Sequence, residues 1–306
     1  MYCQAVLPRA GLGNKLFPWA RCRVFSLAYG IPMIAPTWTQ VQLGPLLRRD
    51  RDARMYGDLF KSGPPGYVSG LRRVWMRLNA GPSVDEPADL RLLPAQRGGN
   101  QSVVFRGAKN HFQSLTGWDG VLLRELRALT RARWVRRADD IGEVEIGIHV
   151  RRGDFAEACS ADDFINRGAI RTPIEWFIQS LRTIREIHGY ALPAFVVSDA
   201  PDSALDVLLE TEAVRRIDTG SAIGDLLLLS KAKLLIASGG STFSGWAAFL
   251  GQMPTVAYPG QSLTWFKIGP RRGQFIGEWS HQQANPAPLV DDIRRLGDFV
   301  ISRSTP

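Results

Sequence analysis

Two adjacent arginines stand directly after an apolar run that is typical of a buried strand. The run covers residues 145–150, and the segment that leaves it reads HVRRGD at 149–154. In an extended chain, His149 and Arg151 point to one side and Arg152 to the other. A guanidinium keeps its charge when partly removed from water and binds phosphate through paired hydrogen bonds. The segment therefore predicts an anion-binding site, and a simple surface ion pair between arginine and Asp154 is the alternative.

A segment rich in serine and glycine follows another apolar run at 234–237. It reads SGGSTFS from Ser238 to Ser244. The glycines let backbone N–H groups approach a ligand, and Ser241 and Thr242 place hydroxyls at the start of a predicted helix. A helix N-terminus with free N–H groups favours phosphate, although serine and threonine also serve as ordinary helix caps.

A third segment of interest is the glycine turn GLGN at 11–14, between a predicted strand at 3–7 and a predicted helix at 15–29. Its residues Gly11, Gly13 and Asn14 would bring backbone close to a ligand held between two domains. The turn lacks the third glycine of the dinucleotide fingerprint, and the chain has no Walker pattern.

Further polar side chains follow other predicted strands. Ser198 and Asp199 come after a strand at 194–197, and Asp225 lies in a predicted helix at 222–230. Both carboxylates are candidates to accept hydrogen bonds from a base or a ribose. For Asp225 a place in the first turn of its helix is an equally good explanation.

The elements that must position these side chains indicate an α/β protein of two domains. From residue 144 onward short apolar strands alternate with helices, which predicts a doubly wound parallel sheet whose ligands bind at the carboxyl ends of its strands. Residues 3–35 form a βαβ unit, and residues 40–120 are rich in glycine and proline, which indicates long loops and short elements. We place the domain boundary between residues 1–143 and 144–306. One long helix is expected over 122–137.

The charge is concentrated in the first domain. The chain of 306 residues has a net charge of +9, and residues 1–143 hold 22 basic and 11 acidic side chains. Residues 71–78 predict an amphipathic helix with three arginines. Such a helix is typical of one that packs its apolar side on a core, and it also fits peripheral contact with an anionic membrane surface. The basic half predicts an anionic partner or an ordinary solvated basic surface.

Composition excludes several protein classes. Apolar residues make up 45% of the chain and charged residues 22%, which excludes a mostly disordered chain. No run of 18 apolar residues predicts a membrane-spanning helix. The three cysteines form no C-x-x-C pair, and the four histidines are scattered, so we expect no structural zinc and a reducing compartment. Because residues 1–7 are too short for the apolar core of a secretion signal, we expect a cytoplasmic protein.

The segments GLGN at 11–14, HVRRGD at 149–154, DLLLLS at 225–230 and IASGGSTFSGWAAFL at 236–250 together resemble the α1,2-fucosyltransferases. The larger group includes the α1,6- and protein O-fucosyltransferases. The resemblance covers the second half of the chain and the glycine turn near its start. The sequence departs from the family at Ala10, where many bacterial relatives have glycine, at Lys15, where glutamine is common, and at Gly245, where tryptophan is common. The reaction class therefore follows more directly than the identity of the sugar.

The resemblance implies a GT-B-like fold, with two Rossmann-type domains facing a cleft, and an inverting glycosyltransferase that needs no metal and takes GDP-fucose as its donor. It implies that Arg151 binds the β-phosphate with His149 beside it, and that Asp225 faces the guanine. The donor site would comprise Gly11, Gly13, Asn14, His149, Arg151, Arg152, Ser198, Asp199, Asp225, Ser238, Ser241, Thr242, Phe243 and Ser244.

The catalytic base is not settled by the residues alone. Transfer from a nucleotide sugar develops negative charge on the leaving diphosphate, and without a metal the charge must be met by arginine and backbone N–H groups. The acceptor hydroxyl needs a base, for which Asp154 and Glu157 come first and Asp162 and Asp163 next. The expected partners are the nucleotide sugar and a glycan acceptor, a polysaccharide or a lipid-linked oligosaccharide. A different donor sugar and a non-catalytic GDP- or glycan-binding protein are the alternatives. Nucleic acid is not expected, because no aromatic–basic interleaving is evident.

Overall fold

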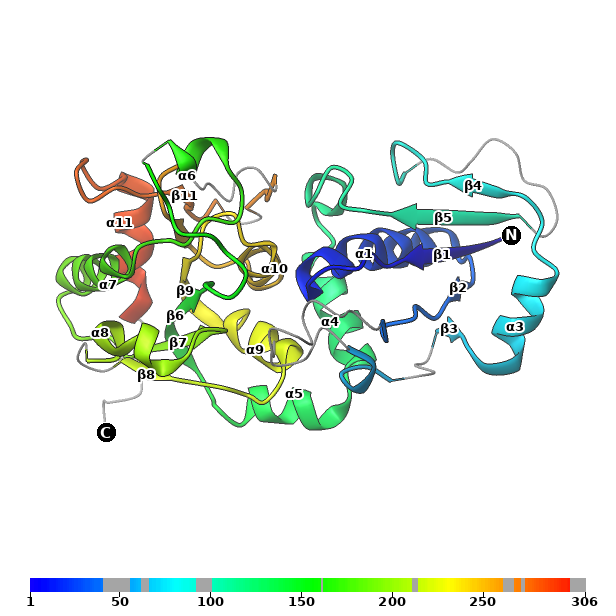
Figure 1. Ribbon diagram of the computed structural model, residues 1–306, viewed down its shortest axis with the longest axis horizontal. Helices are drawn as coiled ribbons and strands as arrows, with labels where there is room; N and C mark the ends of the chain where they lie inside the picture. Colours follow the sequence, from blue (N-terminus) through cyan, green and yellow to red (C-terminus); the bar gives the residue numbers. More distant parts are fainter. Residues whose placement is uncertain are drawn as a thin grey trace. The chain divides into compact units, whose positions relative to one another are not determined.

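The computed structural model describes residues 1–40, 56–61, 66–91, 101–160, 162–210, 214–260, 267–270 and 273–297. The chain divides into two compact units, Met1–Val135 and Arg136–Pro306. The division falls inside the helix α5 (Ala132–Asp139), somewhat before the boundary predicted from the sequence. Each unit contains one parallel sheet with helices (Figure 1).

Unit 1 is built on a five-stranded parallel sheet in the order β3-β2-β1-β5-β4. The strands are β1 (Tyr2–Val6), β2 (Met33–Ile34), β3 (Tyr67–Val68), β4 (Ser83–Asp85) and β5 (Ser102–Arg106). The helix α1 (Leu12–Tyr29) packs against β1 and β5 and ends at Gly30, whose φ of 65° is the left-handed conformation of a helix C-cap. The predicted strand–turn–helix–strand unit is therefore present. The short β3, β4 and β5 lie within the region where we expected long loops and short elements.

The structure differs in part from two helical predictions in unit 1. The expected single helix over 122–137 is two helices, α4 (Asp119–Leu129) and α5. Thr130 between them is extended, its hydroxyl donates to the carbonyl of Leu126 at 2.7 Å, and it forms a β-bridge with Phe60. The helix α3 (Gly70–Leu78) is present, but it has no buried residue, so its apolar side does not pack on the core.

Unit 2 carries a six-stranded parallel sheet in the order β11-β10-β9-β6-β7-β8. The strands are β6 (Val144–Val150), β7 (Ala194–Ser198), β8 (Val214–Arg216), β9 (Ala232–Ala237), β10 (Thr255–Ala257) and β11 (Ile276–Glu278). The helices are α6 (Asp163–Asn166), α7 (Ile174–His188), α8 (Asp206–Leu209), α9 (Ala222–Leu229), α10 (Thr242–Gly251) and α11 (Ala287–Arg294). This is the doubly wound sheet that the sequence predicted, with β11 as an additional strand.

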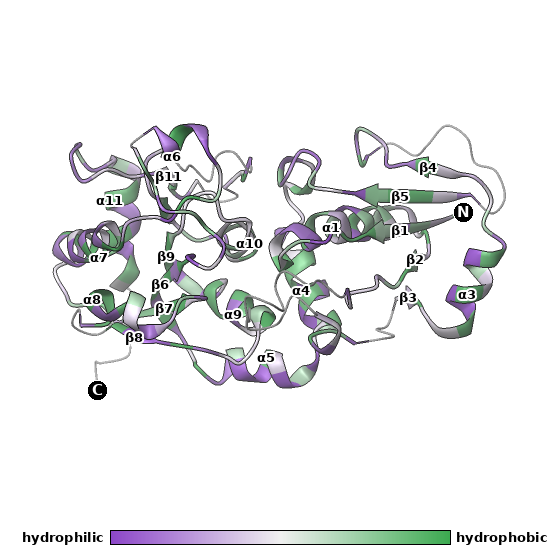
Figure 2. Cartoon of the chain, viewed as in Figure 1, coloured by the Kyte–Doolittle hydropathy of each residue, from purple (hydrophilic) through white to green (hydrophobic). Residues whose placement is uncertain are grey.

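The two faces of the unit 2 sheet are covered by different helices. Along β6, Ile146 and Ile148 point into a large apolar core that α7 and α11 complete. Gly147 points the other way, where a Cβ atom would lie 2.9 Å from that of Ala232 and close to Leu229 of α9. Figure 2 shows that the strands at the centre of this sheet are hydrophobic. Among the described helices, none is long and apolar enough to span a membrane.

Candidate functional site

The candidate site lies at the carboxyl ends of β6, β7 and β9, where the strand order of unit 2 reverses. From β6 the chain proceeds outward through β7 and β8, then returns to place β9 on the other side of β6. Segments that leave β6 and β9 at such a switch point diverge and leave a crevice where ligands bind. The HVRRGD segment leaves β6 and the SGGSTFS segment leaves β9, so the topology brings the two predicted segments together.

His149 joins the end of β6 to the start of α10. The side chain is 5% exposed, its Nδ1 lies 2.6 Å from the hydroxyl of Ser244, and its ring stacks on Phe243 with centroids 4.9 Å apart. Burial lowers the pKa of His149 to about 4; Asp199 opposes the shift and Arg151 adds to it. The imidazole is therefore neutral near pH 7, and it holds the two loops together without adding charge to the site.

Two serines fix the backbone at the end of β6. The hydroxyl of Ser238 donates to the carbonyl of His149 at 2.9 Å and accepts from the amide of Arg151 at 2.8 Å. On the other side, the hydroxyl of Ser198 donates to the carbonyl of Val150 at 2.7 Å. Because the hydroxyls of both serines are engaged in this way, their main effect is to set where Arg151 leaves the sheet.

Arg151 is held between two carboxylates. Its guanidinium lies 2.5 Å from Asp154 and 2.7 Å from Asp199, and it sits over the ring of Phe155 at 5.6 Å. Asp199 also accepts from the amide of Arg152 at 2.9 Å. Two ion pairs and one aromatic ring contact thus orient the Arg151 side chain, which is still about a quarter exposed. An arginine that binds an external anion needs this combination of orientation and exposure.

Gly153 allows Asp199 to make these contacts. A Cβ atom at position 153 would lie 2.2 Å from Oδ2 of Asp199, which is closer than any real contact. The glycine in the HVRRGD segment therefore leaves the space that the Asp199 carboxylate, which follows β7, occupies.

A third arginine, Arg171, also lies at the site and was not predicted from the sequence. Arg171 donates to the carbonyl of Arg152 at 3.1 Å and pairs with Glu157 at 2.6 Å, and Arg152 lies 3.7 Å from the same carboxylate. Glu157 is 72% exposed at its side chain. A β-bridge between Ala156 and Ile170 brings Arg171 here, and this pairing of distant segments has no signal in the local sequence.

The start of α10 completes the anion-binding character of the site. Ser241 is the N-cap, and its hydroxyl accepts from the amide of Ser244 at 3.4 Å. Gly240 before it has a φ of 65°, which glycine adopts without strain. The helix has ten residues and no acidic side chain in its first turn, so its N-terminal dipole is not neutralised by a carboxylate there.

The remaining predicted residues lie at other places. Asp225, on α9, is buried and accepts from the amide and hydroxyl of Thr219 at 3.0 and 2.8 Å, so it holds the loop after β8. Asp163 accepts from the amides of Cys159 and Ser160 and from the guanidinium of Arg167, and these bonds, led by that from Cys159, lower its pKa. Asp162 lies exposed beside it.

The glycine turn belongs to unit 1. Gly11 is the N-cap of α1, and Gly13 and Asn14 lie in its first turn. The amide of Leu12 donates to the hydroxyl of Tyr56 at 3.1 Å. The fully buried Lys15 donates to the carbonyl of Pro8 at 2.8 Å and to Gln40, so this departure from the family pattern holds the loop before α1.

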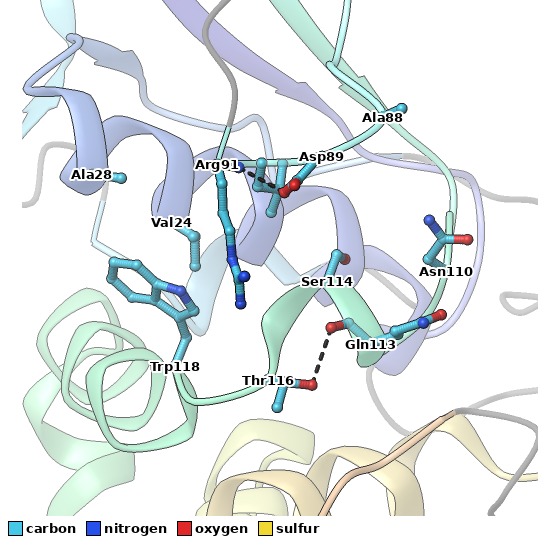
Figure 3. A pocket seen from close by; sticks show the side chains of 11 residues that line it. Val24, Ala28, Ala88, Asp89, Arg91, Asn110, Gln113, Ser114, Thr116 and Trp118 are labelled. Carbon is cyan, nitrogen blue, oxygen red and sulfur yellow. Dashed lines mark hydrogen bonds between the residues drawn. The ribbon is translucent and has the colours of Figure 1, made fainter.

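Unit 1 also contains a polar cavity of about 280 Å³ (Figure 3). Trp118, Arg91 and Asp89 line it together with Asn110 and Gln113, and α1 closes one side. Asn110 has a φ of 53°, a left-handed conformation that asparagine adopts more readily than most residues other than glycine. An aromatic side chain among amides and charges is a lining that suits a sugar, which presents both hydroxyls and apolar ring faces.

Within the described ranges, no group of three or more His, Cys, Asp or Glu side chains is arranged to hold a metal ion. The cations and carboxylates at the end of β6 instead pair with one another. Arg151, Arg152 and Arg171 face Asp154, Asp199 and Glu157. An anion that binds here would therefore replace carboxylates as the partner of arginines that are already oriented.

Comparison with known proteins bears on the family and on the fold of the chain. Residues 123–269 match glycosyl transferase family 11. A crystal structure of the α1,6-fucosyltransferase NodZ soaked with GDP-fucose is similar to this chain with a TM-score of 0.53 and 15% identity, over 84% of this chain and 95% of that one. A structure of NodZ from Bradyrhizobium gives a TM-score of 0.52 at 15% identity, over 85% and 96%. No curated protein sequence matches the chain significantly.

The likeness to NodZ confirms the GT-B-like fold. The family match confirms the resemblance and the enzyme class that the motifs predicted, and it spans every segment of the candidate site from β6 to α10. The chain thus carries a domain of glycosyl transferase family 11 over residues 123–269.

Proposed function

We propose that the protein transfers fucose from GDP-fucose to a hydroxyl of a glycan acceptor, with inversion and without a metal ion. The observation that carries the proposal is that the oriented Arg151 follows β6 and the N-terminus of α10 follows β9, the two neighbouring strands at the switch point of unit 2. The family match and the fold shared with NodZ, whose crystals were soaked with GDP-fucose, support it.

In the proposed reaction, the donor diphosphate occupies the space between Arg151 and the start of α10. As the bond between the sugar and the β-phosphate breaks, negative charge grows on the leaving GDP. The guanidinium of Arg151 and the amides at the start of α10 meet that charge, and the hydroxyls of Ser241 and Thr242 add donors. Such charge stabilisation by a single preorganised donor is commonly worth a factor of about 10² to 10³ in rate.

Asp154 and Asp199 act in this scheme as positioning residues. Each accepts from Arg151, and each would give up part of that contact when the diphosphate arrives. His149, neutral and stacked on Phe243, keeps α10 against the end of β6 without competing for the phosphate. Glu157 is the more exposed of the two leading candidates for the base, and it is paired with Arg171 and Arg152.

We propose that unit 1 supplies the acceptor side. Its net basic charge and the cavity lined by Trp118, Asp89 and Arg91 support this assignment. The aromatic face would contact the apolar side of a sugar ring, and the charged and amide groups would bind its hydroxyls.

The test is a donor panel combined with GDP binding. Wild type is incubated with GDP-fucose, GDP-mannose and UDP-sugars while the released nucleotide is measured, and GDP binding is measured by calorimetry. Arg151→Ala is compared with Arg182→Ala, which removes an exposed arginine from α7, away from the site. We expect turnover of GDP-fucose and a loss of about 10² to 10³ in rate for Arg151→Ala alone.

Three outcomes would overturn the proposal. Turnover of another nucleotide sugar with GDP-fucose untouched would identify a different donor. GDP binding without turnover under any acceptor would identify a binding protein. An Arg151→Ala variant with a normal rate would remove the assigned site.

A further inference from the structure

Helix α3 in unit 1 exposes an unusual amount of apolar surface. Leu71 is 88% exposed, Val74 52%, Trp75 62% and Leu78 82%. Of the nine large apolar side chains that are exposed in the described residues, four stand on this one helix of nine residues. Single exposed apolar residues are common on protein surfaces, but a contiguous group usually marks a contact site.

The four side chains form a stripe that points away from the unit. At about 100° of rotation per residue, they fall within an arc of about 100°. The helix is attached through the opposite side, where Met76 packs on Tyr2, Ile34 and Val68, and where Arg73 donates to the hydroxyl of Thr37 at 2.5 Å. Figure 1 places α3 beside β3, and Figure 2 shows purple and green segments alternating along it.

Positive charge borders this stripe on both edges. Arg72 and Arg77 lie on opposite sides of it, both exposed, and the helix sequence GLRRVWMRL contains no acidic residue. Partial burial and the nearby Arg77 lower the pKa of Arg73, as expected where cations gather. An apolar strip with a tryptophan and flanking arginines matches the boundary between lipid headgroups and acyl chains.

We propose that α3 binds an anionic lipid bilayer, with Leu71, Val74, Trp75 and Leu78 entering the interface and Arg72 and Arg77 contacting headgroup phosphates. The site is independent of the proposed transfer reaction, since it uses other residues. A second copy of the chain is a poorer occupant. The helix is about 13 Å long, its stripe offers far less than the roughly 800 Å² per partner of a stable interface, and a symmetric contact would oppose arginine to arginine.

The test is co-sedimentation of the full chain with vesicles, at 0.1 M salt. One set holds 30% phosphatidylglycerol in phosphatidylcholine and the other phosphatidylcholine alone. We expect binding to the anionic set and at least tenfold less binding to the neutral set. Trp75→Ser with Leu78→Ser should lower the partition coefficient at least tenfold, and Arg72→Gln with Arg77→Gln should lower it about 30-fold. Val207→Ser, which changes an apolar residue of unit 2 that is 60% exposed, should have no effect.

The changed positions are exposed, so the variants should keep the circular dichroism spectrum and melting temperature of the wild type. A wild type that stays in the supernatant with anionic vesicles would overturn the proposal. So would vesicle binding that survives both double variants. A different outcome would assign the stripe to a second copy of the chain. In that case the protein would not bind vesicles, and light scattering would find a dimer that dissociates in the variant with Trp75→Ser and Leu78→Ser.

Discussion

The neutral state of His149 leads to a quantitative prediction about acid. His149 is 5% exposed and contacts Ser244 and Phe243, and its pKa is lowered to about 4, chiefly by burial. In the unfolded chain the same imidazole would titrate near 6.5. Between about pH 6.5 and 4, His149 is protonated in the unfolded chain but stays neutral in the folded protein. The stabilising contribution is therefore complete above about pH 6.5 and is lost as the pH falls toward 4.

The size of the effect follows from the two pKa values. The difference between 6.5 and about 4, at about 1.36 kcal/mol for each pH unit, amounts to about 3 kcal/mol at low pH. By pH 5 about 2 kcal/mol is already lost relative to pH 7. For a protein whose total stability is about 5 to 15 kcal/mol, that loss is large enough to measure.

Two measurements check this prediction. An NMR titration of the imidazole protons should show a His149 midpoint near pH 4. Urea unfolding at pH 7 and pH 5 should lose about 2 kcal/mol more in the wild type than in His149→Asn, in the transition that includes Arg136–Pro306. Asparagine keeps a polar atom near Ser244 but does not titrate, and His188→Asn on α7 is the matched control. A midpoint above pH 6, or equal acid losses in wild type and His149→Asn, would refute the assigned burial.

Two further predictions concern the arginine site. Gly153→Ala should reduce turnover at least tenfold with little change in fold, because the added Cβ would displace Asp199 from Arg151. The control, Gly168→Ala, has open space around the added Cβ and should retain full activity. A fully active Gly153→Ala enzyme would show that Asp199 does not position Arg151. Activity should survive dialysis against EDTA, because Arg151 and the start of α10 are proposed to meet the diphosphate charge. A strict requirement for Mg²⁺ or Mn²⁺ would contradict this role.

The central strands of unit 2 were predictable because they are short, largely apolar runs, each followed by a polar residue. The runs at 145–150, 194–197 and 234–237 correspond to β6, β7 and β9, and their neighbouring positions follow from the parallel winding rule. The strand β11 was missed because Ile276–Glu278 contains one strongly apolar residue. Its pairing with β10 is a long-range contact rather than a local preference.

Helix α3 shows a different limit of periodicity. The spacing of Leu71, Val74, Trp75 and Leu78 identifies the residues that share one side of the helix. It does not say on which side the rest of the protein lies. Here Met76 and Arg73 make the attachment, because Met76 meets an apolar surface formed by Tyr2 and Val68 that only the folded sheet assembles.

The sequence predicts which segments meet at the candidate site, but not what each of their side chains contacts. The sequence places Arg151 and Ser238 at strand ends, and topology brings them together. It gives no indication that Ser238 would be occupied by the backbone around His149, which leaves Arg151 and the start of α10 as the groups that face outward. The serines of such a segment need not contact the ligand to matter. A hydroxyl that sets where an arginine leaves the sheet controls the position of its charge, and in charge stabilisation position decides how much the charge is worth.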